Sequence, residues 1–352
     1  RSYALIEFRR RNYLGAINYG QRALKLFEAD VETHILLAKA YLLAGKINEA
    51  NTMANQAIEL NPNNKEANIV YAQTLSVVRG RPAGVQYMQN IVNKYPLIKE
   101  YRLALGKMYY DDESYNDAKT IFEQLLNIEP NYKEAKIELG RTYRNLKLLQ
   151  KALDQFIQAA VMDPADAVPL NEAGLLYLQT DKYKKAITQF ERVLRINKIY
   201  PLAHYHIGQA YLALGDTKKA IEYAHRERKI NSKLADSFIL AAEAYEKMGQ
   251  YTLCAKEYHE ALKLRSQGAL IYVKIATCYR LAGNLDIAES MLDQAKKIED
   301  GLPDIYREQG QIYEMKAFYD RAILAYDRYL ALSPNAPDAR QVRQKLKALG
   351  VK

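Results

Sequence analysis

The chain has 352 residues, 49% of them hydrophobic and 26% charged, and its formal net charge is +10. This apolar content excludes a disordered chain, and the lack of any run of about 18 apolar residues excludes a membrane-spanning helix. Two cysteines provide no disulfide framework, so we expect Cys254 and Cys278 to act as small apolar residues, with a disulfide between them as the second interpretation.

The sequence repeats itself every 34 residues with no insertion or deletion. In each copy the eighth and twentieth residues are small, and the eleventh is tyrosine in every copy but one. A fixed period with fixed columns is the signature of stacked repeats, which form one continuous unit rather than separate domains.

In chain order, the sequence predicts a partial repeat, a series of full repeats and a final helix. Residues 1–30 form the partial repeat, in which Ala16 and Ala23 occupy columns of a second helix. The full repeats span 31–64, 65–98, 99–132, 133–166, 167–200, 201–234, 235–268, 269–302 and 303–336. Residues 337–352 are expected to form a capping helix with Val342, Leu346 and Leu349 on its inner face.

Each full repeat contains two apolar patterns of helical period. In residues 99–132, the first pattern includes Leu105 and Tyr109, and the second includes Phe122 and Leu125. Pro130 ends the second helix, because proline cannot continue a helix and disfavours helix in the residue before it. Two such helices cannot bury their apolar faces alone, so neighbouring repeats must cover them.

These columns resemble the tetratricopeptide repeat, which has small residues at positions 8 and 20, tyrosine at 11, an aromatic residue at 24 and proline at 32. Position 24 holds Phe122, Phe156, Phe190, Tyr258 and Tyr326. The resemblance implies an all-α fold, a right-handed superhelical α-solenoid of stacked helix-turn-helix units. It also implies that first helices line a concave groove, second helices form a convex back, and the protein is a scaffold for protein partners.

Repeat 201–234 departs from the pattern. Its aromatic column holds Ala224, and a column that is usually small holds Glu227. We expect its second helix to pack less fully, with Tyr223 compensating; the alternative is a hinge or a socket for a partner side chain. At the tyrosine column of the same repeat, we expect Tyr211→Ala to cost about 3–5 kcal/mol, the penalty for emptying a large buried site.

The sequence contains no recognisable catalytic motif. It contains no nucleotide-binding loop, nucleophile elbow or zinc-ligand cysteine pairing. His204 and His206 are two residues apart and diverge on a helix, which disfavours a metal site. The carboxylate clamp of some tetratricopeptide proteins is also absent, because no first helix has lysine at position 5. We therefore predict no enzyme activity, no cofactor and no metal.

The resemblance places positions 2, 5, 6, 9, 12 and 13 of each first helix in the groove. In repeats 167–200 and 201–234 these positions are mostly uncharged and partly apolar, whereas repeats 133–166 and 235–268 contribute charge. Such strips mark contact surfaces, so we expect a helical or extended peptide to bind there. The expected contact residues are Arg141, Arg144, Asn171, Leu175, Leu178, Gln179, Leu202, Tyr205, Gln209, Leu212, Glu243 and Glu246.

In this interpretation the two arginines favour an acidic end of the peptide, and the two glutamates favour a basic end. The alternative is that the chain covers the strip itself. Nucleic acid and anionic membrane surfaces are less favoured partners, because the basic residues are scattered among acids and no aromatic platform accompanies them. The oligomeric state is left open.

Two other functions remain open: an adaptor region of a larger enzyme such as a transferase, and a structural part of a bacterial secretion, pilus or flagellar apparatus. The first residue is Arg1 rather than Met, so a signal peptide or anchor would not be visible. The sequence is compatible with both the cytoplasm and the bacterial periplasm.

Overall fold

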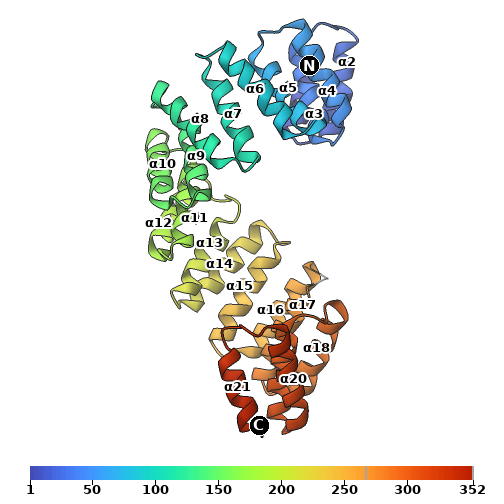
Figure 1. Cartoon of the computed structure of the whole chain (residues 1–352), viewed down its shortest axis with the longest axis vertical. Coiled ribbons are helices and arrows are strands. Elements are labelled where there is room, and N and C mark those ends of the chain that lie inside the picture. Colours follow the sequence, from blue (N-terminus) through green and yellow to red (C-terminus); the bar gives the residue numbers. More distant parts are fainter. Residues whose placement is uncertain (266–267, 351–352) are drawn as a thin grey trace. The chain divides into compact units, whose positions relative to one another are not determined.

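The computed structural model describes residues 1–265 and 268–350. Within these residues the protein is all-α, with 21 helices and no strand (Figure 1). No helix in the described ranges is both long enough and apolar enough to cross a membrane. The predicted fold class is confirmed.

The helices form two compact units, Arg1–Glu172 and Ala173–Lys352, and each is described by itself. The first unit holds α1 (Ser2–Arg9), α2 (Tyr13–Leu24), α3 (Val31–Leu43), α4 (Ile47–Leu60), α5 (Lys65–Val78), α6 (Arg81–Lys94), α7 (Lys99–Asp111), α8 (Tyr115–Ile128), α9 (Lys133–Asn145), α10 (Leu149–Met162) and the start of α11 (Ala167–Gln179).

The second unit begins within α11. It continues with α12 (Tyr183–Ile196), α13 (Ala203–Ala213), α14 (Thr217–Ile230), α15 (Ala235–Lys247), α16 (Tyr251–Leu264), α17 (Ala269–Leu281), α18 (Leu285–Ile298), α19 (Pro303–Met315), α20 (Tyr319–Leu332) and α21 (Ala339–Ala348). In both units helices pack on their neighbours in the chain, for example α3 on α4 in the first unit and α15 on α16 in the second. The final helix, α21, buries Val342 and Leu346 against the preceding helices.

The small residue at position 8 makes room for the aromatic ring at position 24. A Cβ atom placed on Gly140 would lie 2.6 Å from the Phe156 ring, and one on Gly174 would lie 2.8 Å from the Phe190 ring. Both rings are fully buried. At Gly140 and Gly174, a side chain larger than a hydrogen atom would therefore clash with the ring unless the two helices moved apart.

The tyrosine column is less deeply buried than the sequence suggested. Tyr211 is only partly buried, and its ring stacks on Tyr223 at 5.6 Å with Lys219 Nζ 4.7 Å from its centroid. Among the described residues, the largest fully buried side chains are instead Tyr101, Tyr258, Tyr326, Phe122, Phe156 and Phe190, five of which belong to position 24. The expectation that Tyr211 is a large buried side chain was wrong. The loss of about 3–5 kcal/mol on truncation to alanine is therefore expected for the aromatic residues at position 24 instead.

Cys254 and Cys278 are both fully buried and are joined in a disulfide. Their Cα atoms lie 6.1 Å apart, within the usual range for disulfides. The bond links α16 to α17, the facing helices of consecutive repeats. The structure thus takes the second of the two interpretations that the sequence left open.

Glu227 is a buried carboxylate with a structural task. Its side chain is 1% exposed, and its oxygens accept hydrogen bonds from the backbone N–H groups of Leu202 (3.2 Å) and Tyr205 (3.4 Å). These groups lie at the start of α13, where the first N–H groups of a helix have no partner within it. Glu227 therefore caps α13 from α14, an arrangement that a small residue could not provide.

The empty aromatic column of the same repeat is filled from outside it. A Cβ atom on Gly208 would lie 2.7 Å from the Leu240 side chain, which comes from α15 in the following repeat. Tyr223 contributes only its Cβ atom to this contact, at 3.4 Å. Leu240, more than Tyr223, therefore compensates for Ala224.

We expect Glu227→Ala to destabilise the start of α13 by about 1–2 kcal/mol, as loss of a helix cap does elsewhere. Native-state hydrogen exchange would measure this as faster exchange of the Leu202 and Tyr205 amides. Glu222→Ala, which removes an exposed acid from the same helix, is the control and should leave both amides unchanged. Equal exchange in the two variants would contradict the capping role.

Candidate functional site

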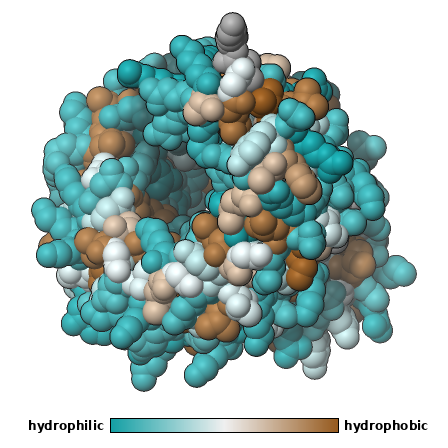
Figure 2. Space-filling model, turned by 90° about the horizontal axis from the view of Figure 1, so that it is seen from below, coloured by the Kyte–Doolittle hydropathy of each residue, from teal (hydrophilic) through white to brown (hydrophobic). Residues whose placement is uncertain are grey.

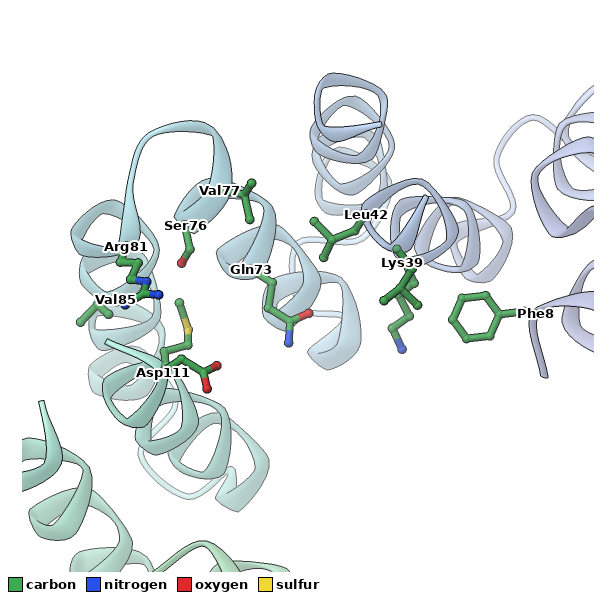
Figure 3. Close-up of a pocket in the computed structure, with 11 residues that line it drawn as sticks. Phe8, Lys39, Leu42, Gln73, Ser76, Val77, Arg81, Val85 and Asp111 are labelled. Atoms are coloured by element: carbon green, nitrogen blue, oxygen red, sulfur yellow. The ribbon is translucent and has the colours of Figure 1, made fainter. Parts of the chain in front are cut away.

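A pocket of about 690 Å³ opens on the first helices of the N-terminal unit. Five helices supply its walls, and Figure 3 shows Gln73 of α5 between Lys39 and Leu42 of α3 on one side and Asp111 of α7 on the other. The lining residues are Phe8, Lys39, Leu42, Leu43, Gln73, Ser76, Val77, Arg81, Val85, Met108 and Asp111. A concave, largely apolar site with a few polar groups is the usual form of a binding site.

Two apolar side chains of the lining are more than half exposed. Leu43 is 56% exposed and Val77 is 54% exposed. They occupy position 13 of two consecutive repeats, a position that the resemblance assigns to the groove. Phe8 of α1 approaches from the side of the partial repeat (Figure 3), so the partial repeat contributes an aromatic wall.

The local sequence explains why this pocket forms at α5 and α6. Gly84 lies so close to α5 that a Cβ atom on it would come within 2.4 Å of the Ala72 carbonyl oxygen. Gly80, with φ of 91°, turns the chain between these helices, and Pro82 lies in the first turn of α6. The tight α5–α6 hairpin leaves Ser76 and Val77 at the pocket edge.

The charged groups of the pocket are only partly engaged. Lys39 forms an ion pair with Glu66, and Arg81 Nη1 lies 3.9 Å from Asp112 Oδ1. The Gln73 amide makes no hydrogen bond to any residue that the structure describes, so it is free to bind a peptide backbone.

Asp111 has an altered acidity. Loss of hydration raises the pKa of its carboxyl group above the usual value, and the negative charge of Glu138 adds to the increase. Arg81 and Lys107 oppose both effects. A positively charged group arriving in the pocket would therefore stabilise the Asp111 carboxylate and gain affinity from it.

The structure gives the predicted arginines a partner within the chain. Arg141 Nη2 lies 2.7 Å from Glu172 Oε1, and Arg144 Nη1 lies 2.7 Å from Glu172 Oε2. The Glu172 side chain is 9% exposed and joins α9 to α11. The sequence treated these arginines as available to an acidic peptide, but an acidic ligand would have to compete with Glu172 for them.

The predicted leucines are less accessible than expected. Leu212 is 8% exposed and packs with Ala241 and Ala244, whose small side chains let α15 approach α13 closely. Leu175 and Leu178 are partly buried against the core formed by α12 and α13. Leu175, Leu178 and Leu212, which lie in α11 and α13, are therefore not the exposed apolar side chains that the sequence suggested.

Leu202 and the polar residues of the predicted set remain closer to solvent. Leu202 is 36% exposed, and Gln179 is exposed. Gln209 Nε2 donates to the Tyr205 hydroxyl at 2.9 Å, and its Oε1 lies 3.0 Å from Nδ1 of His206. Gln209 is therefore occupied by its neighbours.

Three further members of the set lack a hydrogen-bond partner among the described residues. Oδ1 of Asn171 is buried without one. Neither Glu243 nor Glu246 forms an ion pair in the described part of the chain. Burial raises the pKa of Glu243, and Glu246 adds to this, whereas Lys274 and Lys247 oppose it. A basic ligand group would relieve this unfavourable charge.

Figure 2 shows apolar residues as small, separate patches among hydrophilic ones on the face in view. Large exposed apolar surfaces mark contact sites, so the paired exposure of Leu43 and Val77 inside a pocket distinguishes that site from scattered surface leucines. No cluster of potential metal ligands occurs among the described residues.

The sequence missed the N-terminal pocket, although one signal was present. Position 13, which was expected to face the groove, is apolar in both Leu43 and Val77. Repeats 167–200 and 201–234 contain the longer uncharged stretch, and sequence alone does not distinguish a buried leucine from an exposed one.

Comparison with known proteins supports the fold. A family model described as "TPR repeat" matches residues 174–215, and two described as "Tetratricopeptide repeat" match residues 8–74 and 94–169. No curated protein sequence matches the chain.

Several solved structures are similar at low sequence identity. A tetratricopeptide repeat protein from Parabacteroides merdae ATCC 43184 has a TM-score of 0.56 at 18% identity and covers 71% of this chain and 98% of its own. The structure described as "APC/C hetero-tetramer Cut9-Hcn1" has a TM-score of 0.51 at 12% identity, and the match covers 100% of this chain and 96% of that chain. Pseudomonas aeruginosa pilF has a TM-score of 0.51 at 18% identity, covering 60% and 97%. At these identities the likeness concerns the fold.

Proposed function

Because this chain belongs to the tetratricopeptide repeat family, we propose that it is a non-catalytic scaffold that binds a partner protein on the first helices of its repeats. The scaffold comprises the partial repeat 1–30, the nine full repeats between 31 and 336, and the capping segment 337–352. The N-terminal pocket is its main anchoring site, and a helical or extended peptide of the partner is its ligand.

The exposure of Leu43 and Val77 inside one pocket is the observation that carries this proposal. Full burial of a leucine or valine side chain stabilises a complex by about 1.5–3 kcal/mol. A partner side chain that covered the exposed halves of Leu43 and Val77 would therefore contribute substantially to the free energy of binding. Gln73 would hydrogen-bond the peptide backbone, as amide side chains do in peptide grooves.

The pocket also defines the chemistry of the peptide. Its apolar walls suit one large apolar side chain, such as leucine or phenylalanine, as the anchor. Asp111 favours a basic residue next to that anchor. Loss of hydration and the charge of Glu138 disfavour the Asp111 carboxylate, and a positive charge from the peptide would stabilise it.

Further contacts of the same partner are proposed on the residues predicted from the sequence. Glu243 and Glu246 would attract a basic segment, and Leu202 and Gln179 offer accessible surface. Arg141 and Arg144 would contribute only where an acidic ligand group competes with Glu172. Leu212 would not contact the partner directly but would hold α13 against α15 below the contact surface.

Site-specific photo-crosslinking tests the anchoring site. A benzophenone amino acid at Val77 should crosslink a partner in cell extract, and the product should disappear when Leu43→Asp is added. The same probe at Val161, an apolar residue of α10 that is 73% exposed, is the matched control. We expect Leu43→Asp to lower the Val77 product by at least about tenfold, the effect of removing about 1.4 kcal/mol or more of binding energy. The Val161 probe should give little product with or without this substitution.

Mass spectrometry of the product would identify the partner and its crosslinked segment. An apolar residue flanked by a basic one in that segment would agree with the proposed chemistry. Equal products from both positions, or a Val77 product unchanged by Leu43→Asp, would count against the pocket as the anchoring site.

A further inference from the structure

A second pocket, of about 270 Å³, lies in the C-terminal unit between α18, α19 and α20. Its walls include Lys296 of α18, Gln309 of α19, and Arg321, Ala325 and Arg328 of α20. Second helices form two of its three sides, so it lies away from the groove positions used by the proposed partner peptide.

Two residues that line this pocket differ from the residues at the same positions of the other full repeats. Gln309 occupies position 7, where every other full repeat has an apolar residue, for example Ile207 and Ile275. Ala325 occupies position 23, where every other full repeat has a larger side chain, for example Met53 and Met291. The first exchange places an amide in the core between helices, and the second removes the side chain that would fill the space beside it.

Gln309 is 5% exposed, and its amide makes no hydrogen bond to the part of the chain that the structure describes. Neither amide atom is among the fully buried polar atoms without a partner, so the amide still reaches solvent although the residue as a whole is buried. Because Gln309 lines the pocket, its amide is available to a bound group with hydrogen-bonding oxygens.

Three cationic side chains surround the same space. Lys296 Nζ lies 4.8 Å from the centroid of the Tyr306 ring, and Arg328 Cζ lies 5.7 Å from it. Arg321 Cζ lies 5.9 Å from the centroid of the Tyr313 ring. None of these three cations forms an ion pair with a described residue, and no acidic side chain lines the pocket.

Two of the acids that act on the tyrosines of the pocket have partners, whereas Asp293, which acts on Tyr313, is exposed and unpaired within the described residues. Asp300 accepts a hydrogen bond from the Tyr306 hydroxyl at 2.8 Å, and Glu289 accepts one from Tyr313 at 2.9 Å and one from Lys316 at 2.6 Å. The tyrosine hydroxyls are neutral, so Asp300 and Glu289 keep their negative charge, and Arg321 is among the groups that lower the pKa of Glu289. Neither acid lines the pocket, so the three cations are in excess within its lining.

We propose that this pocket binds a phosphate monoester group. Lys296, Arg321 and Arg328 supply its counter-charge, and the Gln309 amide donates a hydrogen bond to one of its oxygens. Arginine matches the geometry of phosphate oxygens, and a phosphate monoester carries close to two negative charges at neutral pH, which three cations without an acid favour over a single carboxylate. The volume is small for a drug-sized ligand and suits a phosphate with a short attached group.

Titration calorimetry of the full chain with inorganic phosphate, at constant ionic strength, tests the proposal. Saturable binding is expected for the wild type. Ala325→Met and Lys296→Leu should each weaken it at least about tenfold, because the first fills the pocket and the second removes a charge-assisted contact. Both introduce residue types that other repeats of this chain carry at the same positions, so both should fold, which circular dichroism would verify.

Arg226→Gln is the matched control for charge. Arg226 occupies position 26 of its repeat, as Arg328 does, and lies over the Tyr223 ring at 4.9 Å, but it pairs with Glu222 and lines none of the pockets described here. This variant should bind phosphate as the wild type does. Equal weakening by Arg226→Gln would show non-specific attraction to a basic protein and overturn the proposal.

Three other results would also overturn it: no saturable binding of phosphate, unchanged binding by Ala325→Met, or acetate binding as tightly as phosphate. Phosphoserine and glycerol 3-phosphate titrations then distinguish the source of the group, a phosphorylated side chain or a lipid headgroup. The compound that binds more tightly than inorganic phosphate identifies the natural attachment.

Discussion

Phe190→Ala is expected to destabilise its repeat by about 3–5 kcal/mol, the usual cost of removing a large buried aromatic side chain. The Phe190 ring is fully buried, lies over Gly174 and stacks on His206 with centroids 5.3 Å apart. Its removal leaves a cavity between α11, α12 and α13 that neighbouring backbone cannot fill without moving.

Native-state hydrogen exchange is the suitable measurement, because a stacked-repeat chain need not unfold in one step. Amides of α11 to α13 should exchange on the order of a hundredfold faster in Phe190→Ala. Tyr211→Ala in the same unit is the control; its ring is only partly buried, so a loss of roughly 1–2 kcal/mol is expected. A larger effect at Tyr211 than at Phe190 would refute the assignment of the core to position 24.

The fold was predictable because its main constraint is local and repeated. Small residues at positions 8 and 20 allow two helices to pack closely, and this requirement appears in every copy of the 34-residue period. The depth of burial at each column was not predictable in this way. Tyr211 and Phe190 are both aromatic residues in fixed columns, and only the packing of three helices decides which one loses its contact with water.

The site depended more strongly on contacts between repeats. Leu212 and Val77 both occupy groove positions by sequence, but Leu212 is covered by α15 whereas Val77 is 54% exposed. Ala241 and Ala244 allow that cover, and no rule applied to a single repeat would identify it. Phe8 joins the N-terminal pocket from the partial repeat, which the sequence treated only as the beginning of the array.

Charges in the groove were misjudged for a related reason. Arg141 and Arg144 appeared free, because their partner Glu172 lies about one repeat further along the chain. Arg280 and Glu308 are joined by the same kind of contact between first helices of neighbouring repeats. Several groove charges therefore hold the repeats together and are less available to ligands than their sequence positions suggest.

Glu308→Ala is expected to destabilise the C-terminal unit by about 3–5 kcal/mol, the range seen when one partner of a buried ion pair is removed. Arg280 Nε lies 2.8 Å from Glu308 Oε2, and the two side chains are 14% and 4% exposed. Without Glu308, Arg280 of α17 would keep its charge in a site with little water. Hydrogen exchange of α17 and α19 amides would report the loss.

The double variant Arg280→Met, Glu308→Leu separates a charge effect from a packing effect. Replacing a buried pair with apolar residues of similar volume is often neutral or stabilising, so its stability should lie within about 1 kcal/mol of the wild type. Arg307, whose Nη2 lies 3.9 Å from Glu308 Oε1, is 31% exposed and should remain hydrated after the change. If the double variant were as unstable as Glu308→Ala, the contact would matter for its shape rather than for its charge, and the account of the groove ion pairs given above would have to be abandoned.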